Sequence, residues 1–421
     1  MAMNVKTGLM RAGQCIAAMV AVTVVVAAEA KPIIIFNEDA DHLMLSKRVH
    51  KDPARFEAQE FRQYFESVVG AGKVTHLFLN VNDRLANYPS EVLEPYWDCV
   101  KDPAVKTPQW VLAHKDAVDR GIDFVQIGCE VSRAHGAEPW LSIRMNDIHF
   151  VDDPAYHSNI GYWKRHPELW LDPASVTNGC TKGWWQRAYD YRKEPVQARM
   201  LAFIAEALAR YDVDGVELDW MRFEYHVPRE TARGEGAEAL NRFMRRAKAV
   251  VDEAARRRGH AIRIAARVDS DPVSALNHGT DYRVWAKEGL MDWLIPCNFF
   301  ATVDFELPFR KWEDEVKAIN PKVLVIPGLD SGLMPNGNME RRNLTVDNYA
   351  AWGDKMYAAG AKGAYFFNLF CALEDEPGCD PNTGVWAFVT KEGFTPENIV
   401  KKPRFIPAGL KRECVLGGWC E

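Results

Sequence analysis

Residues 211–224 read Tyr-Asp-Val-Asp-Gly-Val-Glu-Leu-Asp-Trp-Met-Arg-Phe-Glu, and this stretch decides the expected fold. Successive side chains of a β-strand point to opposite faces, so Glu217 and Asp219 share one face while Val216 and Leu218 share the other. Two carboxylates on one face near a strand end are costly unless they are paired, hydrated or used in chemistry. The stretch therefore predicts a short buried strand that ends in a charged site.

The same kind of short apolar run recurs along the chain and alternates with amphipathic helical stretches, which is typical of βα units and a parallel sheet. The eight predicted strands are Ile33–Asn37, Val74–Asn80, Pro139–Met145, Gly215–Asp219, Ile262–Val268, Trp293–Asn298, Val323–Pro327 and Gly363–Asn368. Predicted helices include 54–69, 196–209, 237–257 and 345–359. Eight such pairs, with no Gly-rich phosphate turn after the first strand, favour an α/β (β/α)8 TIM barrel over a dinucleotide-binding sheet.

The first 30 residues have the composition of a secretory signal peptide, with positive Lys6 and Arg11, an apolar run, and a small-residue cleavage site at Ala30. We expect an exported chain, periplasmic or secreted, with no membrane span. We expect residues 31–402 to form the catalytic barrel and 403–421 a C-terminal extension. Its cysteines are close enough for a local disulfide, Cys414 with Cys420.

Charge and composition exclude several partner classes. The formal net charge is −6 and well mixed, so neither nucleic acid nor an anionic membrane surface is an expected partner. No Cys or His spacing fits a zinc site, and neither a metal nor a cofactor is expected. Cys129 and Cys297 lie in apolar stretches and are expected to be free core thiols. The sequence says nothing about oligomeric state.

A barrel places its catalytic groups at the carboxyl ends of the strands, and all eight predicted strand ends turn polar there. Adjacent carboxylates at such an end suit glycoside hydrolysis, in which one acid donates a proton and another faces the sugar cation. Asp219 is the expected nucleophile, or the base if the reaction inverts. Three acids are candidate proton donors, with the second favoured: Glu217, Asp269 and Asp330. The alternative is an ion-pair network of the acids with Arg222 or Arg267.

Other strand-end residues are expected to bind a saccharide. Arg144, Arg222 and Arg267 would pair with the acids or grip a carboxylate or sulfate of an acidic sugar. Amide side chains both donate to and accept from hydroxyls, although each has an equally good role in a turn or cap. The amides are Asn37, Asn80, Asn146, Asn298 and Asn368. His42 fits a solvated loop better than a sugar contact.

The connection after the third strand is long, about 50 residues, and rich in aromatic side chains. Flat rings such as Trp163 stack on the C–H faces of sugars. The alternative is a small separate core that holds the loop in place, and the sequence favours neither.

The chain resembles the family-10-like glycosyl hydrolases, a group of bacterial (β/α)8 proteins. The match rests on residues 213–222, which resemble that group's V-D-G-x-x-x-D-x-x-R motif at strand four, and on His166-Pro167-Glu168. The resemblance implies glycoside hydrolysis of a poly- or oligosaccharide. The motif is also similar to that of the α-amylase-like enzymes, whose nucleophile maps onto Asp219.

The same motif is similar to the family 18 chitinase motif D-G-x-D-x-D-W-E, which Asp214, Gly215, Asp219 and Trp220 fit. Trp220 would then contact the saccharide. Met221, however, stands where those enzymes carry their proton donor, which argues against a substrate-assisted chitinase. The competing hypothesis is a lectin-like barrel that binds carbohydrate without cleaving it. A second carboxylate at glycosidase distance from Asp219 would favour the enzyme.

Overall fold

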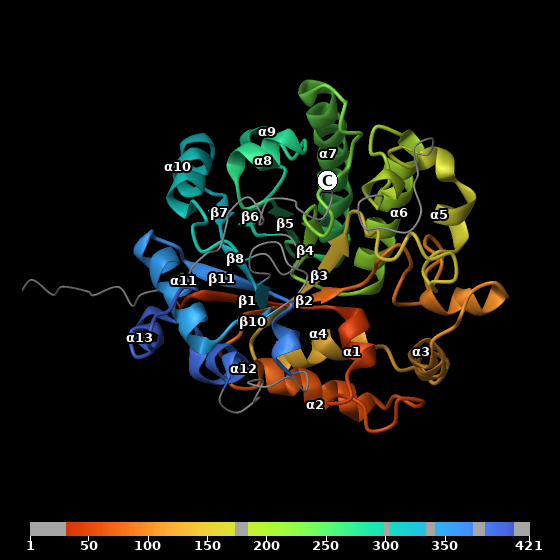
Figure 1. Ribbon diagram of the computed structural model, residues 1–421, viewed down its shortest axis with the longest axis horizontal. Helices are drawn as coiled ribbons and strands as arrows, with labels where there is room; N and C mark the ends of the chain where they lie inside the picture. The colour runs from red at the N-terminus through yellow and green to blue at the C-terminus, as the bar shows by residue number, and fades with distance from the viewer. Residues whose placement is uncertain (1–30, 173–183, 299–302, 334–341, 374–383, 408–421) are drawn as a thin grey trace, which may run out of the picture. The chain divides into compact units, whose positions relative to one another are not determined.

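The computed structural model describes residues 31–172, 184–298, 303–333, 342–373 and 384–407. The predicted signal peptide and the Cys414–Cys420 pair lie outside these residues. All eight predicted strands occur, and they form one parallel sheet (Figure 1). The strands are β1 (Ile33–Glu38), β2 (His76–Asn80), β3 (Glu138–Arg144), β4 (Gly215–Asp219), β5 (Arg263–Val268), β6 (Trp293–Pro296), β7 (Leu324–Val325), β8 (Gly328–Asp330) and β11 (Gly363–Phe367). A separate antiparallel pair consists of β9 (Gly332–Leu333) and β10 (Arg342–Asn343).

The sheet closes through the extended segment that contains β7 and β8. β7 pairs with β6, and β8 pairs with β11, which pairs with β1. Between them, Ile326 N–H donates to Leu294 O, and Tyr365 N–H donates to Pro327 O, each at 2.9 Å. Pro327 has no N–H, which explains why the strand pairing is interrupted between β7 and β8. β7 lies within the predicted strand Val323–Pro327, whereas β8 lies just beyond it. The order β1 to β6, β7–β8, β11 gives a TIM-barrel-like α/β fold.

Helices lie around the outside of this sheet (Figure 1). The longer ones are α2 (Ala58–Val69), α3 (Gln109–Asp119), α4 (Phe124–Ala134), α6 (Glu194–Arg210), α7 (Arg233–Arg258), α9 (Tyr282–Glu288), α10 (Phe309–Ile319) and α11 (Val346–Ala358). The shorter ones are α1 (Ala40–Leu45), α5 (Gly161–Arg165), α8 (Pro272–Asn277), α12 (Val385–Ala387) and α13 (Pro396–Ile399). Thr345 caps α11 by accepting from the Asn348 N–H, at the start of the predicted helix 345–359. Among the described helices, none has the length and apolarity that a bilayer crossing requires.

The barrel interior is filled by side chains rather than open. The Trp140 ring stacks on Phe78 at 4.8 Å and on Trp293 at 4.5 Å between ring centroids. Cys297 belongs to the same buried cluster, and both it and Cys129 are unpaired thiols, as predicted. Side chains on the face of β3 and β4 that includes Trp140 therefore point into the barrel, and Glu217 and Asp219 share that face.

Gly215 belongs to the D-G pair of the strand-four motif, and packing explains why no side chain stands there. A Cβ at Gly215 would lie 2.3 Å from a carbon of the Trp140 ring. Trp140 is fully buried between two other aromatic rings and has nowhere to move. The glycine is thus a requirement of the barrel core.

We predict that Gly215→Ala lowers the free energy of unfolding by about 1–3 kcal/mol or more, because the added methyl overpacks the core. Gly234→Ala is the matched control. It lies in α7 with no atom within 4 Å of the added Cβ, and should raise the free energy of unfolding by about 0.5–1 kcal/mol. Urea denaturation of the two variants checks both values. A Gly215→Ala protein as stable as the wild type would contradict this packing.

Candidate functional site

The two carboxyl groups of β4 sit between polar side chains of both neighbouring strands. In register, Glu217 lies beside Ser142 of β3, and Asp219 lies between Arg144 of β3 and Arg267 of β5. The carboxyl end of the barrel therefore carries a row of arginine, aspartate and arginine across three adjacent strands.

Asp219 is held by an ion pair with Arg267. The Arg267 Nη1 lies 2.9 Å from each carboxylate oxygen, and the Met221 N–H donates to Oδ1 at 2.9 Å. Asp219 is 1% exposed and Arg267 0%. Arg267 also donates to Asn298 O and lies over the Phe367 ring at 3.8 Å. The ion-pair alternative considered from the sequence is therefore present at this position.

Glu217 lies on the same face of β4 as Asp219 but has different hydrogen-bond partners. Its Oε2 accepts from Ser142 Oγ at 2.5 Å and from Asn37 Nδ2 at 3.2 Å. Burial, followed by the charge of Asp219, raises the pKa of Glu217 to about 8. At neutral pH Glu217 therefore carries a proton, whereas the Arg267 guanidinium compensates a negative charge on Asp219.

A second cluster of charged side chains lies at the carboxyl end of β3. Arg144 donates to Asp147 Oδ2 at 2.9 Å and to Asp39 Oδ2. His149 Nδ1 lies 2.8 Å from Asp147 Oδ1, and its Nε2 lies 3.0 Å from an Arg222 nitrogen. Burial alone would raise the pKa of Asp147, but His149 and the nearby guanidiniums outweigh it and hold that pKa well below its usual range.

Sequence reasoning assigned no role to Asp147 or His149. The available signal was the run of polar residues just after a strand, in which a period of two places Asp147 and His149 on one side of the chain and Arg144 on the other. The charges that lower the pKa of Asp147 come first from His149 and then from Arg144 and Arg84, and Arg84 lies 63 residues away in the sequence. No local pattern contains that information.

Asp41, at the start of α1, was also missed. It is half-buried, and burial together with the charges of Asp39 and Asp83 raises its pKa to about 8. Asp83 follows β2, so the shift depends on two strand ends meeting. Asp41 is thus a second carboxyl group that holds a proton at neutral pH.

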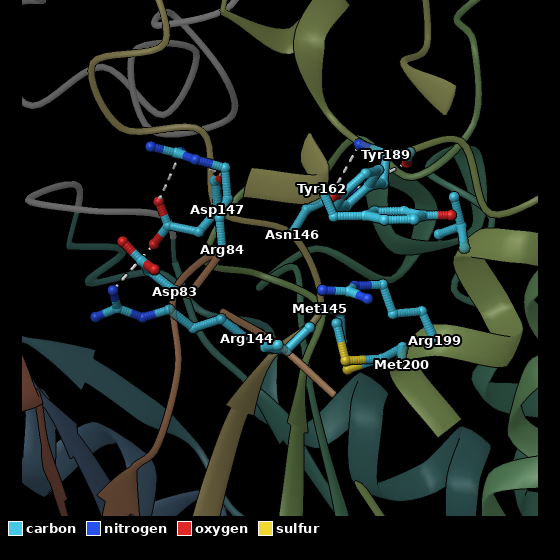
Figure 2. Close-up of a pocket in the computed structure, with 12 residues that line it drawn as sticks. Asp83, Arg84, Arg144, Met145, Asn146, Asp147, Tyr162, Tyr189, Arg199 and Met200 are labelled. Carbon is cyan, nitrogen blue, oxygen red and sulfur yellow. Dashed lines mark hydrogen bonds and ion pairs between the residues drawn. The ribbon is translucent and has the colours of Figure 1, made fainter. Parts of the chain in front are cut away.

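The cavity beside this charged group is small. Figure 2 shows Arg84 and Arg144 directed toward Asp147 on one side, and Tyr162, Tyr189, Arg199 and Met200 on the other. Its volume of about 20 Å³ holds a single water molecule and not a sugar ring. This cavity is not the saccharide site.

The predicted amides make contacts within the protein. Asn80 of β2 donates to Ser142 O of β3 and so joins two strands. Asn146 donates to Tyr189 O and Tyr225 O and so fastens two loops together. Asn368, at φ 56°, donates to Asp330 Oδ2 at 3.0 Å.

Two other predicted site residues, Asn298 and Asp330, also lie at this end of the barrel. The buried Asn298 Nδ2 has no hydrogen-bond partner within the part of the chain that the structure describes. Asp330 is fully buried and accepts from the Gly332 N–H.

Asp269, the proton donor favoured from the sequence, contacts residues other than the β4 acids. Its Oδ2 lies 3.4 Å from His278 Nδ1, and its Oδ1 accepts from the Asp271 N–H. Glu224, a buried residue of the loop after β4, is close enough for the charge of Asp269 to contribute to the raised pKa of Glu224, although burial is the largest cause. Asp269 thus belongs with His278 and Glu224 and not with the acids of β4.

The described aromatic side chains after β3 form a small core of their own. Trp163 stacks on Trp170 at 4.8 Å and donates to Arg187 O, and Trp184 donates to Asp152. Residues 173–183 of the same connection lie outside the described part. These contacts are those expected of a core that holds the loop in place.

Two further predicted binding residues are buried elsewhere. Trp220 is 1% exposed and packs among Tyr191, Phe243 and Trp285, on the helical side of the sheet. The expectation of a solvated loop for His42 was wrong. That residue lies in α1, is buried, and stacks on Phe370 at 4.2 Å. Within the described residues, no three His, Cys, Asp or Glu side chains are arranged to hold a metal.

No protein-family model matches the sequence, and no curated protein sequence matches it significantly. Among solved structures, the chain is similar to a cycloisomaltooligosaccharide glucanotransferase from Paenibacillus sp. (TM-score 0.42, 11% identity, 70% of this chain and 38% of that one). It is also similar to a family 18 N-acetylglucosaminidase from Paenibacillus barengoltzii (TM-score 0.40, 12% identity, 83% of this chain and 96% of that one). A third similar structure is a cell-surface chitinase from Paenibacillus sp. (TM-score 0.46, 8% identity, 81% of this chain and 31% of that one). Similarities this low assign no activity to the chain.

We predict that Arg267→Met lowers the free energy of unfolding by about 3–5 kcal/mol, because it leaves Asp219 buried without a compensating charge. The double variant Asp219→Asn/Arg267→Met removes both charges and should regain much of that loss. Chemical denaturation of the wild type and the three variants forms a double-mutant cycle. Additive losses would contradict a direct ion pair.

Glu217 should make stability depend on pH. Its pKa in the folded protein is about 8, against 4.5 for the ordinary side chain. Its contribution is fully present below pH 4.5 and is lost as the pH rises toward 8, by on the order of a few kcal/mol. The free energy of unfolding should therefore fall less between pH 5 and 8 in Glu217→Gln than in the wild type. Asp41 is present in both proteins, so its own effect on the free energy of unfolding cancels in the comparison. If the free energy of unfolding had the same pH dependence in both proteins, the raised pKa of Glu217 would be contradicted.

Proposed function

We propose that this protein is a glycoside hydrolase that cleaves a poly- or oligosaccharide with carboxyl groups at the carboxyl end of β4. One observation carries the proposal. Two carboxyl groups on one inward face have opposite environments, since Glu217 is kept protonated by burial and Asp219 is paired with a guanidinium. Neighbouring acids whose environments favour different protonation states supply the acid and the base of such a reaction.

In this proposal Asp219 is the nucleophile, or the base if the reaction inverts, and Glu217 is the proton donor. Among the three donors predicted from sequence, Glu217 is supported by its raised pKa, near 8. Asp269 is paired with His278, and Asp330 accepts from Asn368 and the Gly332 N–H. Asp41 is the rival donor because it also holds a proton at neutral pH and is partly accessible. Export of the enzyme is part of the proposal and rests on residues 1–30.

A second candidate function is carbohydrate binding without cleavage. The observation in its favour is the burial of both β4 acids, with Asp219 already occupied by Arg267 and the Met221 N–H. A hydrolase must open this pair to admit substrate, whereas a lectin-like barrel would keep it as a structural ion pair.

We predict that the wild type cleaves at least one member of a panel of plant, algal and bacterial polysaccharides. Asp219→Asn should lower kcat by about 10³-fold or more while keeping saccharide binding, since it replaces the reacting carboxylate by a neutral amide. Reducing-sugar release and affinity electrophoresis measure the two quantities. Thermal melting of each variant excludes loss of fold as the cause. Binding without turnover by the wild type would favour the lectin-like alternative.

The proton donor is identified by a paired comparison of Glu217→Gln and Asp41→Asn on whichever glycan the wild type cleaves. Loss of the donor should slow natural glycosides by about 10²–10⁴-fold but spare aryl glycosides, whose leaving groups need no proton. It should also remove the fall in activity above pH 8. We expect this behaviour for Glu217→Gln; the same behaviour in Asp41→Asn alone would transfer the role to Asp41.

A further inference from the structure

The loop after β3 exposes one aromatic ring that the small core of that loop does not bury. Phe150 is 47% exposed, whereas Ile148 and Val151, close to it in the sequence, are buried in that core. Among the described residues, Phe405 is the only other Phe, Tyr or Trp that is similarly exposed, and it lies near residue 407, the last that is described. The ring of Phe150 is therefore accessible to a ligand.

The backbone of Phe150 is strained. Its φ is 51°, in the left-handed region that glycine adopts readily and that a bulky side chain rarely occupies. Asn368 is the only other described residue, glycines apart, with a positive φ, and asparagine tolerates this region well. A glycine would make the same turn without strain, so the turn itself gives no reason for a ring. Strain of this kind is concentrated at functional sites.

Two buried side chains hold the peptide groups on both sides of Phe150. Before it, the His149 carbonyl oxygen accepts from Arg84 Nη2 at 2.9 Å. After it, the Phe150 carbonyl oxygen accepts from Asn159 Nδ2 at 2.7 Å and from the Asp153 N–H at 3.0 Å. Arg84 and Asn159 are both buried, so these bonds are shielded from water. A strained conformation persists where surrounding contacts enforce it, and these contacts enforce this one.

The same segment is attached to the charged end of the barrel. His149, the residue before Phe150, has its Nε2 3.0 Å from an Arg222 nitrogen. The Arg222 guanidinium lies 5.5 Å from the centre of the Phe367 ring, and the Arg267 guanidinium lies 3.8 Å from the same centre. Arg267 is the ion-pair partner of the β4 carboxylate. This chain of contacts places Phe150 beside the barrel mouth.

Other rings and hydrogen-bond acceptors lie next to the Phe150 ring. Its centre is 4.7 Å from that of Tyr156 and 5.7 Å from that of Trp184, both half-buried. Trp184 Nε1 donates to Asp152 Oδ1 at 2.7 Å, and the exposed Asp153 follows in the sequence. A carboxylate can accept several hydrogen bonds, so both acids can also accept from hydroxyl groups. Apolar ring surface beside such acceptors is complementary to a sugar, which has C–H faces and a hydroxyl rim.

We propose that Phe150 binds one sugar ring of the saccharide by stacking, beside the mouth and away from the reacting bond. The identity of this ligand rests on the proposed function. The ring expected from the sequence to stack on a sugar, Trp163, is instead buried against Trp170. Phe150 supplies the exposed ring, with Tyr156 and Trp184 packed against it.

The binding test is affinity electrophoresis of the full protein, in the cold, through gels that contain the polysaccharides of the panel above. On the polysaccharide that retards the wild type most, Phe150→Ala should bind about tenfold more weakly, whereas Phe150→Tyr keeps the ring and should bind within about twofold of the wild type. Phe405→Ala is the matched control because it removes an exposed ring elsewhere, and it should bind as the wild type does. Unchanged affinity of Phe150→Ala, an equal loss in Phe405→Ala, or no retardation of the wild type by any polysaccharide would overturn the inference.

A second pair of variants tests whether the ring is kept at a strained position. Phe150→Gly and Phe150→Ala both remove the ring and should lose binding equally. Glycine adopts a φ of 51° freely and alanine does not, so Phe150→Gly should melt about 1–3 °C above Phe150→Ala. The melting curves also show that each variant is folded. An alanine variant that melts at or above the glycine variant would contradict the strain and, with it, the argument for a functional ring.

Kinetics separate this inference from the proposed function. On a glycan that the wild type cleaves, Phe150→Ala should raise KM about tenfold and change kcat by less than about twofold, because a ring away from the reacting bond contacts ground state and transition state alike. Weaker polysaccharide binding by Phe150→Ala in a protein that cleaves no glycan would refute the hydrolase alone. Cleavage with an unchanged KM in Phe150→Ala would refute the stacking position alone. A wild-type dimer that Phe150→Ala dissociates, with unchanged polysaccharide binding, would assign the ring to a contact between two copies instead.

Discussion

The charged end of the barrel depends on the ion pair between Arg267 and Asp219. Two side chains removed from water are stable together only because each compensates the other. The pair also affects its surroundings, because the charge of Asp219 adds to burial in raising the pKa of Glu217 on the same face of β4. Breaking the pair would thus change both acids at once, which links the stability of the barrel mouth to its chemistry.

A second constraint fixes where these groups stand. The barrel interior is occupied by stacked rings around Trp140, and Gly215 leaves room for them. The strand that carries Glu217 and Asp219 is therefore held in place by this packing. The aromatic core below and the arginine row above hold the acids in register with β3 and β5. Rigid placement of this kind is what a reaction between fixed carboxyl groups needs.

The strand pattern predicted the barrel well, because alternation within 211–224 and the other apolar runs is a local property. Even the interruption of the strand pairing between β7 and β8 follows from Pro327. The side-chain partners were less predictable. Asp269 meets His278 and Glu224, and Asp41 meets Asp83, only after separate strand ends come together. His42 and Trp220 could not be placed because the packing of Phe370 and of α7 against them is a tertiary contact. The motif similarity drew attention to Met221, which stands where the family 18 chitinases carry their proton donor. A buried carboxyl group, Glu224, lies three residues further along the same loop.

The central claim is that Asp219 leaves its ion pair to face a sugar. A crystal structure of Glu217→Gln with an oligosaccharide that the wild type binds tests this most directly, because this variant keeps both members of the ion pair. The account predicts an anomeric carbon about 3–3.5 Å from the side chain at position 219, with Arg267 moved away from it. A saccharide bound elsewhere, with residue 219 still sealed against Arg267, would contradict it.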